Sequence, residues 1–225
     1  MLDPRHGSAC SPMDAEPVDP MHADPGPVDP GPVAESTDRV AGLLLAAGSG
    51  RRYGGPKALV SYQGRPLVLR SRDVLVAAGC APVLVVVGAQ AKAVTALVSS
   101  GAIRNPAWPT GMGSSLRAGL AALEATAVTA VVVVLVDMPG VGVEAVRRLA
   151  AVARPDVLAV AGYHGNRWGH PVLLGREHWT GAAASARRDR GARAYLRRHR
   201  GLVRVVPCAD VADATDLDVP PMIRR

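Results

Sequence analysis

The sequence has few aromatic residues: three tryptophans, four tyrosines and no phenylalanine among 225 residues. Because proteins that bind single-stranded nucleic acids stack the bases on aromatic side chains, this scarcity argues against a nucleic-acid partner. Cysteine is scarce as well, and Cys10, Cys80 and Cys208 lie far apart without the spacing of metal ligands. The cysteines therefore indicate neither a disulfide framework nor a zinc site, and we expect a reduced, cytoplasmic protein.

Long apolar runs and a secretory signal are also missing. The longest apolar run, TAVVVVLV at residues 129–136, is far shorter than the ~20 residues of a membrane-spanning helix. The first 38 residues have neither the basic start nor the apolar stretch of a signal peptide. We therefore expect no membrane partner, and the apolar run predicts a core strand.

Residues 1–38 are rich in proline and aspartate, and the string PVDP occurs twice among them. Such a composition buries too little apolar surface to offset chain entropy, which predicts a disordered tail before a single domain at residues 39–225. A docking segment is the alternative. The tail carries eight acids and one arginine, so the other 187 residues hold 25 basic and 11 acidic side chains, a net charge of +14. That charge suits an anionic ligand, although an arginine-rich surface also serves solubility.

Continuous apolar runs alternate with helix-like segments along the domain. The runs predict strands that are buried on both faces, as in a parallel sheet, at residues 40–47, 82–88, 130–137 and 156–163. The segments between and after them predict helices at residues 65–79, 89–100, 114–125 and 143–153. The last quarter predicts a strand at 167–175, a helix through 187–200 and a strand at 202–207. This order predicts an α/β fold, a three-layer α/β/α sandwich with a mostly parallel, Rossmann-like sheet.

A basic, glycine-rich loop, LAAGSGRRYGGPK, occupies residues 45–57, after the first predicted strand. Ligands of such sheets bind where loops leave the carboxyl ends of the strands. The glycines allow backbone N–H groups to face phosphate oxygens, and Arg51 and Lys57 can neutralise phosphate charge, whereas Arg52 is as easily a solvated side chain. The GK[ST] of an ATPase P-loop is missing, and GxGxxxG replaces the GxGxxG of dinucleotide binders. A triphosphate-binding loop is favoured, with a plain surface loop as the alternative.

Lysine is rare among the basic residues. Lys57 and Lys92 are the only lysines among 26 lysines and arginines. Because a compact ammonium and a planar guanidinium are not interchangeable at phosphate sites, a lysine within the loop favours a direct phosphate contact.

The loop and four later segments together resemble the nucleotidyltransferases that complete the molybdenum cofactor, especially their cytidylyltransferase branch. The later segments are NPAWPTGMGSSLRAGL (105–120), VDMPGV (136–141), GHPVLL (169–174), and DRGARAYL (189–196) with TDLDVP (215–220). The resemblance implies the fold of nucleotide-diphospho-sugar transferases and the Mg²⁺-dependent transfer of CMP from CTP to a molybdopterin-type acceptor, with release of pyrophosphate. It also implies a molybdoenzyme or a maturation factor as protein partner. The alternatives are GTP as donor, a sugar phosphate as acceptor, a non-catalytic nucleotide-binding protein and a dinucleotide dehydrogenase.

Two acidic segments are candidates for binding a metal. Asp137 ends the most apolar strand, where a carboxylate can hold Mg²⁺ beside a triphosphate or simply cap the following turn. The resemblance favours the metal ligand. Asp216 and Asp218 alternate on an extended segment, so both side chains can face one site. The resemblance makes Asp216 a second ligand, but the VPPM that follows Asp218 departs from the family pattern, and a solvated turn is the alternative.

The second motif carries polar groups and glycines. Asn105, Ser114 and Ser115 have side chains suited to reading a base edge, although Ser115 can equally cap the helix that begins there. The resemblance places a serine at this position beside cytosine. Gly111 and Gly113 would let the backbone approach the nucleotide closely.

His170 and Arg193 are expected on the side of the acceptor. A phosphate monoester is already ionised near neutral pH, so the reaction requires no strong base, and His170 is expected to line the acceptor pocket or to be structural. Arg193 can meet the acceptor phosphate. The family's GD-x-GAR pattern fits around it, except that Arg188 replaces the glycine.

These considerations give four sets of predicted site residues. The predicted catalytic residues are Arg51, Lys57 and Asp137. The predicted nucleotide-binding residues are Leu45, Ala46, Ala47, Gly48, Gly50, Arg51, Lys57, Asn105, Gly113, Ser114 and Ser115. The predicted metal ligands are Asp137 and Asp216, and the predicted acceptor-binding residues are His170 and Arg193.

Overall fold

The computed structural model describes residues 39–51 and 53–217 of the chain. The predicted tail, Arg52 and Asp218 lie outside the described residues, so the expectations for them stay predictions. Within the described ranges, no helix is both long enough and apolar enough to cross a membrane.

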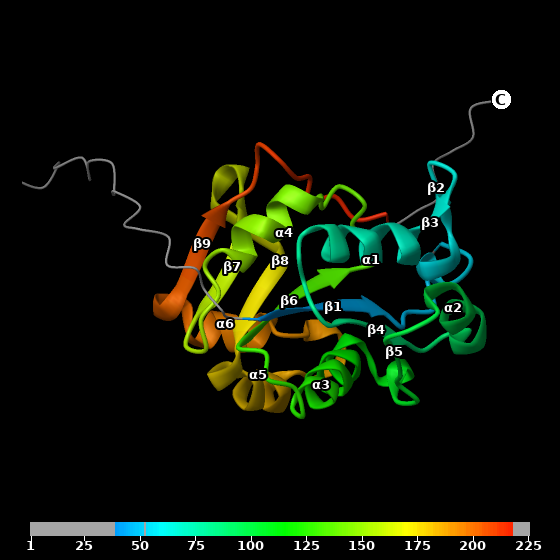
Figure 1. The fold of residues 1–225 in the computed structure, drawn as a ribbon, viewed down its shortest axis with the longest axis horizontal. Coiled ribbons are helices and arrows are strands. Elements are labelled where there is room, and N and C mark those ends of the chain that lie inside the picture. Colours follow the sequence, from blue (N-terminus) through cyan, green and yellow to red (C-terminus); the bar gives the residue numbers. More distant parts are fainter. Residues whose placement is uncertain (1–38, 52, 218–225) are drawn as a thin grey trace, which may run out of the picture. The chain divides into compact units, whose positions relative to one another are not determined.

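A seven-stranded sheet forms the centre of the domain (Figure 1). Its order is β5-β4-β1-β6-β8-β7-β9, formed by β1 (Val40–Ala46), β4 (Val83–Val87), β5 (Ala102–Arg104), β6 (Ala130–Leu135), β7 (Leu158–Tyr163), β8 (Arg167–Gly175) and β9 (Val203–Pro207). Only β8 runs antiparallel to its neighbours, β6 and β7. A short hairpin of β2 (Ser61–Tyr62) and β3 (Arg65–Pro66) follows the glycine-rich loop. The prediction of a mostly parallel α/β sheet is confirmed.

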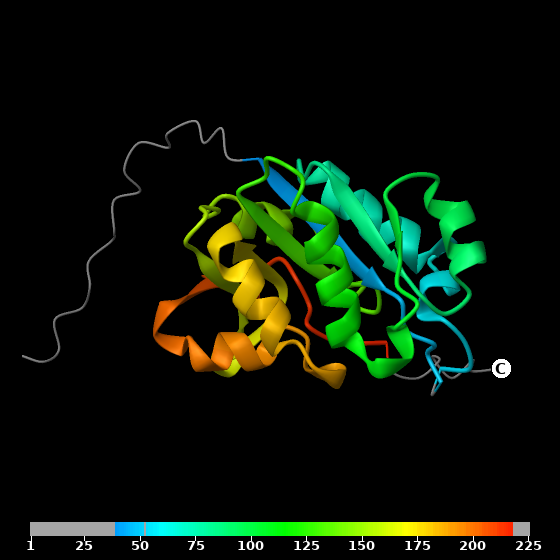
Figure 2. The same ribbon diagram turned by 90° about the horizontal axis from the view of Figure 1, so that it is seen from below.

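Helices cover both faces of this sheet. One face carries α1 (Leu67–Ala77), α2 (Ala91–Val98) and α4 (Val143–Ala150). The other face, which Figure 2 turns toward the viewer, carries α3 (Met112–Leu123), α5 (Trp179–Ser185) and α6 (Arg193–Arg198). Successive side chains of a strand point to opposite faces, so Leu44 joins the first core and Leu43 the second. Burial on both faces explains why continuous apolar runs predicted these strands.

Several elements differ from the prediction. β5, α5 and the β2–β3 hairpin were not predicted from the sequence, because they are short and lack a clear apolar period. The predicted helix at 187–200 is wrong in its first part, where a 3-10 turn (Arg188–Arg190) precedes α6. Arg188 and Gly191 have φ angles of +50° and +48°, and residues in this left-handed region cannot continue a right-handed helix.

Candidate functional site

A cavity of about 510 Å³ opens at the carboxyl ends of β1 and β6. Its wall consists of the loop after β1, the residues after β6, the segment that leads into α3, and one residue from the turn before α6. We call residues 45–57 the glycine loop. The name helix wall denotes the side chains and backbone of Trp108, Pro109, Gly111, Met112, Ser115 and Asp189. A cavity of this size is in the usual range for a small-molecule ligand, roughly 300–1,000 Å³.

The glycine loop is folded around the carbonyl of Gly50. This oxygen accepts hydrogen bonds from the N–H groups of Tyr53, Gly54 and Gly55, at 2.9, 3.0 and 3.2 Å. Gly50 has a φ of +57°, and a Cβ atom there would lie 2.0 Å from the Gly55 oxygen, so no other residue fits. In the described part of the chain, the N–H groups of residues 48–50 donate to no other backbone atom. They line the cavity and can donate to a ligand.

Lys57 and Asp137 meet at the edge of the cavity. The Lys57 Nζ donates to the Asp137 Oδ2 at 2.9 Å, and the two side chains are 15% and 26% exposed. Both residues line the cavity, together with the exposed Arg51. The structure thus brings the three predicted catalytic residues to one site. A ligand that carries phosphate and a metal ion would replace this ion pair by two new ones, ammonium with phosphate and carboxylate with metal.

The carboxylates at this edge fit a magnesium ion that is shared with a substrate. Asp137 lines the cavity, and its backbone oxygen accepts the N–H of Leu217 at 2.9 Å, which holds the neighbouring Asp216 close to the end of β6. Asp216 itself does not line the cavity. Within residues 39–51 and 53–217 there is no cluster of three or more side chains that could hold a metal alone. Mg²⁺ usually takes one or two carboxylates plus substrate phosphates and waters, which matches this donor set.

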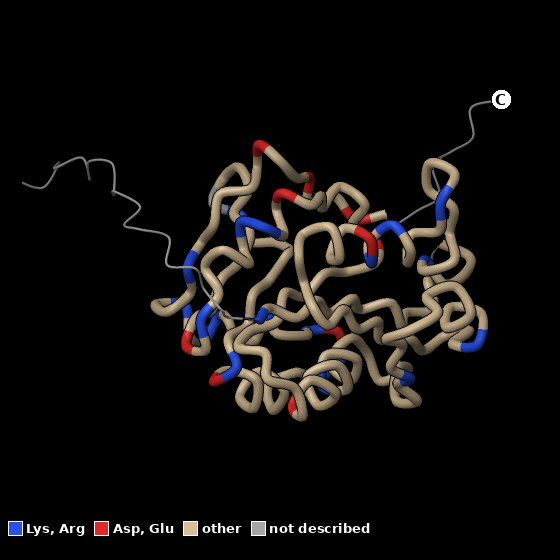
Figure 3. Tube along the Cα trace, viewed as in Figure 1, with Lys and Arg blue, Asp and Glu red and all other residues tan. Residues whose placement is uncertain are grey.

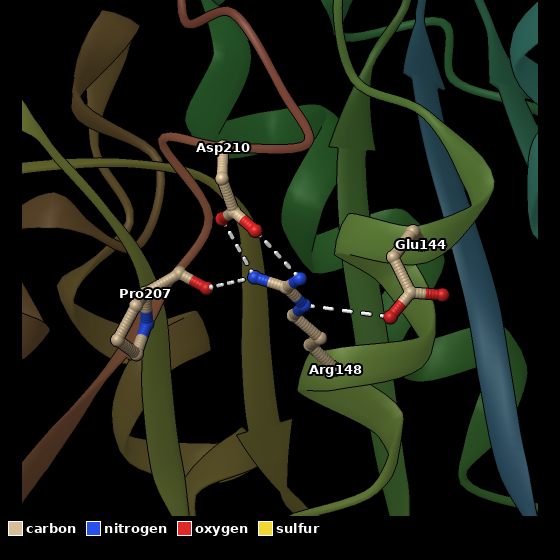
Figure 4. A network of polar contacts seen from close by, with 4 residues as sticks. All are labelled: Glu144, Arg148, Pro207 and Asp210. Atoms are coloured by element: carbon tan, nitrogen blue, oxygen red, sulfur yellow. Dashed lines mark hydrogen bonds and ion pairs between the residues drawn. The ribbon is translucent and has the colours of Figure 1, made fainter.

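The segment that carries Asp216 is clamped to α4. Arg148 donates from its two terminal nitrogens to the carboxylate of Asp210 at 2.7 and 2.8 Å, and also contacts the Pro207 oxygen and Glu144 (Figure 4). The hydrogen bond from Arg148 lowers the pKa of the Asp210 carboxyl below its usual value. Further along, the N–H of Asp213 donates to the Gly140 oxygen at 3.2 Å. These contacts fix the course of the segment toward Asp137.

Asn105 and Ser114 have a structural role in the loop before α3. The Asn105 Nδ2 donates to the hydroxyl oxygens of Ser114 and Ser115 at 2.9 and 3.1 Å, and its Oδ1 accepts the N–H of Ala107. Ser114 in turn donates to the backbone oxygens of Ala107 and Gly111. Both side chains are buried, and only Ser115 lines the cavity. Of the three polar side chains predicted to contact the base, the structure brings only Ser115 to the cavity lining, and the contact itself stays a prediction.

The two glycines of the GMG string admit a distant segment of the chain. A Cβ on Gly113 would lie 2.7 Å from the carbonyl group of Ala186, and one on Gly111 would lie 2.4 Å from the carbonyl carbon of Arg188. Gly113 does not line the cavity, and its close approach is to the backbone of Ala186, so its predicted contact with the nucleotide stays a prediction. The close packing brings Asp189 into the cavity wall, a position that was not predicted for it from the sequence although Asp189 begins the DRGARAYL motif.

Three further predicted residues lie away from the cavity lining, besides Asn105, Gly113, Ser114 and Asp216. Ala46 points to the opposite core. His170 and Arg193 do not line the cavity either, but His170 lies within electrostatic range of both Arg193 and Asp137. The ring of His170 donates from Nδ1 to the Val133 oxygen at 3.1 Å. Burial lowers the pKa of His170, and the charge of Arg193 acts in the same direction, so the imidazole is neutral at pH 7.

Positive charge is spread beyond the cavity. Lys and Arg positions are scattered along the described trace and occur on several elements (Figure 3). The net charge alone therefore does not mark the site, and the basic side chains that line the cavity are those of Arg51 and Lys57.

Comparison with known proteins places this geometry in a wider context. A model of the MobA-like NTP transferase domain matches residues 42–203. The chain is 38% identical over 196 residues to nicotine blue oxidoreductase of Paenarthrobacter nicotinovorans, across 83% of this chain and 95% of that protein. The matched domain contains Lys57, Asp137 and Asp189 and ends before Asp216.

Solved structures show the same fold. Rv0371c of Mycobacterium tuberculosis H37Rv superposes with a TM-score of 0.68 at 25% identity, covering 81% of this chain and 93% of that one. Rv0371c in complex with manganese gives a TM-score of 0.64 at 27% identity, with coverages of 82% and 94%. A metal ion is thus present in a structural relative of this chain.

Proposed function

The chain belongs to the MobA-like NTP transferase family, and from this premise we propose that it transfers CMP from CTP to the phosphate of a molybdopterin-type acceptor, with Mg²⁺ and release of pyrophosphate. One observation carries the proposal: Lys57 and Asp137 form an ion pair on the wall of a cavity whose glycine loop offers N–H groups. A phosphate-binding cation, a metal-binding carboxylate and backbone donors thus converge on one space.

The reaction is a substitution at the α-phosphorus of the nucleotide. An oxygen of the acceptor phosphate forms a bond to this phosphorus, the bond to the oxygen that bridges to the β-phosphate breaks, and its electron pair leaves with pyrophosphate. The acceptor phosphate is largely ionised near neutral pH, so no side chain has to remove a proton. A neutral His170 outside the cavity lining agrees with this requirement. Catalysis then consists of positioning and charge stabilisation.

Each part of the cavity supplies one contribution to this chemistry. The N–H groups of residues 48–50 donate to phosphate oxygens, and Arg51 balances charge on the departing pyrophosphate. Lys57, once released from Asp137, contacts the phosphate that is transferred. Mg²⁺ held by Asp137, with Asp216 as a second ligand, would neutralise the charge of the phosphate oxygens. CTP is favoured by the resemblance of the LAAG and GMGSS strings to the cytidylyltransferases, and the molybdopterin acceptor by the same resemblance.

Pyrophosphate release tests the proposal with substitutions at the ion pair. We expect Lys57→Ala and Asp137→Asn each to lower Mg²⁺-dependent pyrophosphate release about 100-fold or more, as loss of a charge-stabilising group usually does. Lys92→Ala is the matched control, because Lys92 is the only other lysine and is exposed on α2. The proposal fails if both site variants keep the wild-type rate with every triphosphate and acceptor tested.

The same assay separates the donor from the acceptor. Wild-type protein is given each of the four ribonucleoside triphosphates with molybdopterin, with a sugar phosphate, or with no acceptor. We expect turnover with CTP and molybdopterin. Turnover with GTP would support nucleotidyl transfer with a different donor, and turnover with a sugar phosphate would support it with a different acceptor.

Oxidoreduction is a second candidate, favoured by the 38% identity to nicotine blue oxidoreductase. A reduced nicotinamide dinucleotide would then occupy the cavity. Enhanced fluorescence of NADH or NADPH on mixing, followed by its oxidation when a dye is added, would support this candidate. No enhancement and no oxidation, alongside pyrophosphate release, would exclude it.

A further inference from the structure

The helix wall lines the cavity together with the glycine loop and Asp137. Trp108, Pro109 and Met112 give it apolar side chains, and the only side chains with hydrogen-bonding oxygens are Ser115 and Asp189. The position of Trp108 depends on Gly88, since a Cβ there would lie 2.6 Å from Cβ and Cγ of the tryptophan. An aromatic ring beside two polar groups is a surface that can receive a nucleobase.

Asn105 determines the hydrogen-bonding character of Ser115. The Asn105 amide donates to the Ser115 oxygen at 3.1 Å, so this oxygen already serves as an acceptor. Among the described residues nothing accepts the hydroxyl hydrogen of Ser115, which lines the cavity. Ser115 is thereby left as a donor to a ligand.

Asp189 supplies the complementary acceptor. The Cβ position of Gly111 lies 2.7 Å from the Asp189 Oδ1, which places the carboxylate beside the start of α3, the helix that carries Ser115. Arg188 and Arg190 flank Asp189 in the chain, yet within the described residues its carboxylate forms no ion pair. An ionised carboxylate only accepts hydrogen bonds.

We propose that Asp189 selects the base of the donor nucleotide by accepting a hydrogen bond from the exocyclic amino group of cytosine, while Ser115 donates to a ring acceptor of the same base. The inference rests on the proposed nucleotidyl transfer and adds the residue that sets base preference. Cytosine carries an amino donor where uracil carries a carbonyl oxygen, and Asp accepting from this amino group is a known pairing. Uracil would place an oxygen against the carboxylate, with no hydrogen between them.

The experiment compares CTP with a CTP analogue that lacks the 4-amino group, using the full chain. Pyrophosphate release gives kcat/KM for both nucleotides and for UTP with wild type, Asp189→Asn and Asp156→Asn. Asp156→Asn is the matched control, because Asp156 is an exposed carboxylate just before the start of β7, whereas the cavity lies at the carboxyl ends of β1 and β6.

We expect wild type to favour CTP over the analogue roughly 10- to 100-fold, the range for a hydrogen bond to a charged group. Asp189→Asn should lose most of this preference through a lower kcat/KM for CTP, with little change for the analogue. Asp156→Asn should behave as wild type does. Equilibrium dialysis of radiolabelled CTP against wild type and Asp189→Asn measures the same preference without turnover.

Three results overturn the inference. They are an unchanged preference in Asp189→Asn, no preference in wild type, and a wild type that favours UTP or GTP over CTP. Absence of pyrophosphate release with every triphosphate would instead contradict the proposed function. In that case equilibrium dialysis tests the inference. Weaker binding of CTP to Asp189→Asn than to wild type would support the role of Asp189, and equal binding to both would overturn it.

Discussion

The glycine loop and the helix wall are built in different ways, although they line one cavity. The glycine loop takes its shape from neighbours in the chain, since the Gly50 carbonyl accepts N–H groups from residues 53–55. The helix wall depends on distant segments, because Gly111 and Gly113 admit the backbone of residues 186–189. A local motif therefore shapes the part of the cavity that we propose for phosphate, whereas tertiary packing shapes the part that we propose for the base.

The largest effect on activity is expected from a substitution that disturbs the glycine loop alone. In Gly50→Ala the new Cβ would lie 2.0 Å from the Gly55 oxygen, at a φ of +57° that L-residues rarely adopt. The loop must open, which displaces its N–H groups and Lys57. We expect pyrophosphate release to fall about 100-fold, the usual cost of a misplacement near 1 Å at a reaction centre.

Gly55→Ala is the control for this change. A Cβ on Gly55 has no atom within 4 Å, and the residue is outside the left-handed region. We expect it to keep most of the wild-type rate. Equal rates for the two variants would contradict the assignment of the loop to phosphate binding.

The next test disturbs the helix wall alone. In Gly113→Ala the Cβ would lie 2.7 Å from the carbonyl of Ala186 and 2.8 Å from the nitrogen of Arg187. The backbone of this segment must move, and Asp189 moves with it. We expect the preference for CTP over UTP to fall about tenfold, while phosphate contacts and the dependence on Mg²⁺ are kept.

Gly142→Ala serves as its control. Gly142 precedes α4 on the other face of the sheet, and its Cβ would have one ordinary contact, 3.7 Å from the Val211 oxygen. Loss of a glycine at a helix start costs some stability, so this variant separates general destabilisation from a change in base preference. A loss of CTP preference in both variants would show that the preference for CTP over UTP does not depend specifically on the helix wall.

The same contrast explains which features could be predicted from the sequence. The positions of the central strands along the chain were predictable because strands buried on both faces produce continuous apolar runs. Lys57 was singled out by its place in a local motif, and Asp137 by its place at the end of such a run. The structure brings both to one cavity. The site assignments themselves stay predictions until the variants are measured.

The features that were not predictable depend on contacts between distant residues. The polar side chains of Asn105 and Ser114 suggested base recognition, but the fold pairs them with each other inside the loop. The alanines and arginines of residues 187–200 suggested one helix, but the left-handed conformation of Arg188 interrupts it. Asp189 enters the cavity through that interruption, and neither pattern nor propensity contains this information.

The smallest effect is expected from breaking the contact between Arg148 and Asp210, which clamps the C-terminal segment to α4. This clamp is an exception to the difference between the two walls, because it holds a segment that is distant in sequence near Asp137 and the glycine loop. Asp210→Asn removes the charge that pairs with Arg148, but the backbone bonds of Asp213 and Leu217 remain. We expect about a twofold rise in the Mg²⁺ concentration that gives half-maximal pyrophosphate release, since exposed ion pairs contribute little. Base preference should not change.

Acid pH provides an independent check of this clamp. Arg148 lowers the pKa of Asp210 in the folded state, so the carboxylate contributes stability above its unfolded pKa, and this contribution is lost as the pH falls through the lower, folded value. The difference in unfolding free energy between wild type and Asp210→Asn should therefore be present at pH 7 and disappear in strong acid.

Asp73→Asn, which removes another exposed carboxylate paired with an arginine, should leave the Mg²⁺ dependence unchanged. A Mg²⁺ dependence that shifts equally in both variants would show that the clamp does not position Asp216.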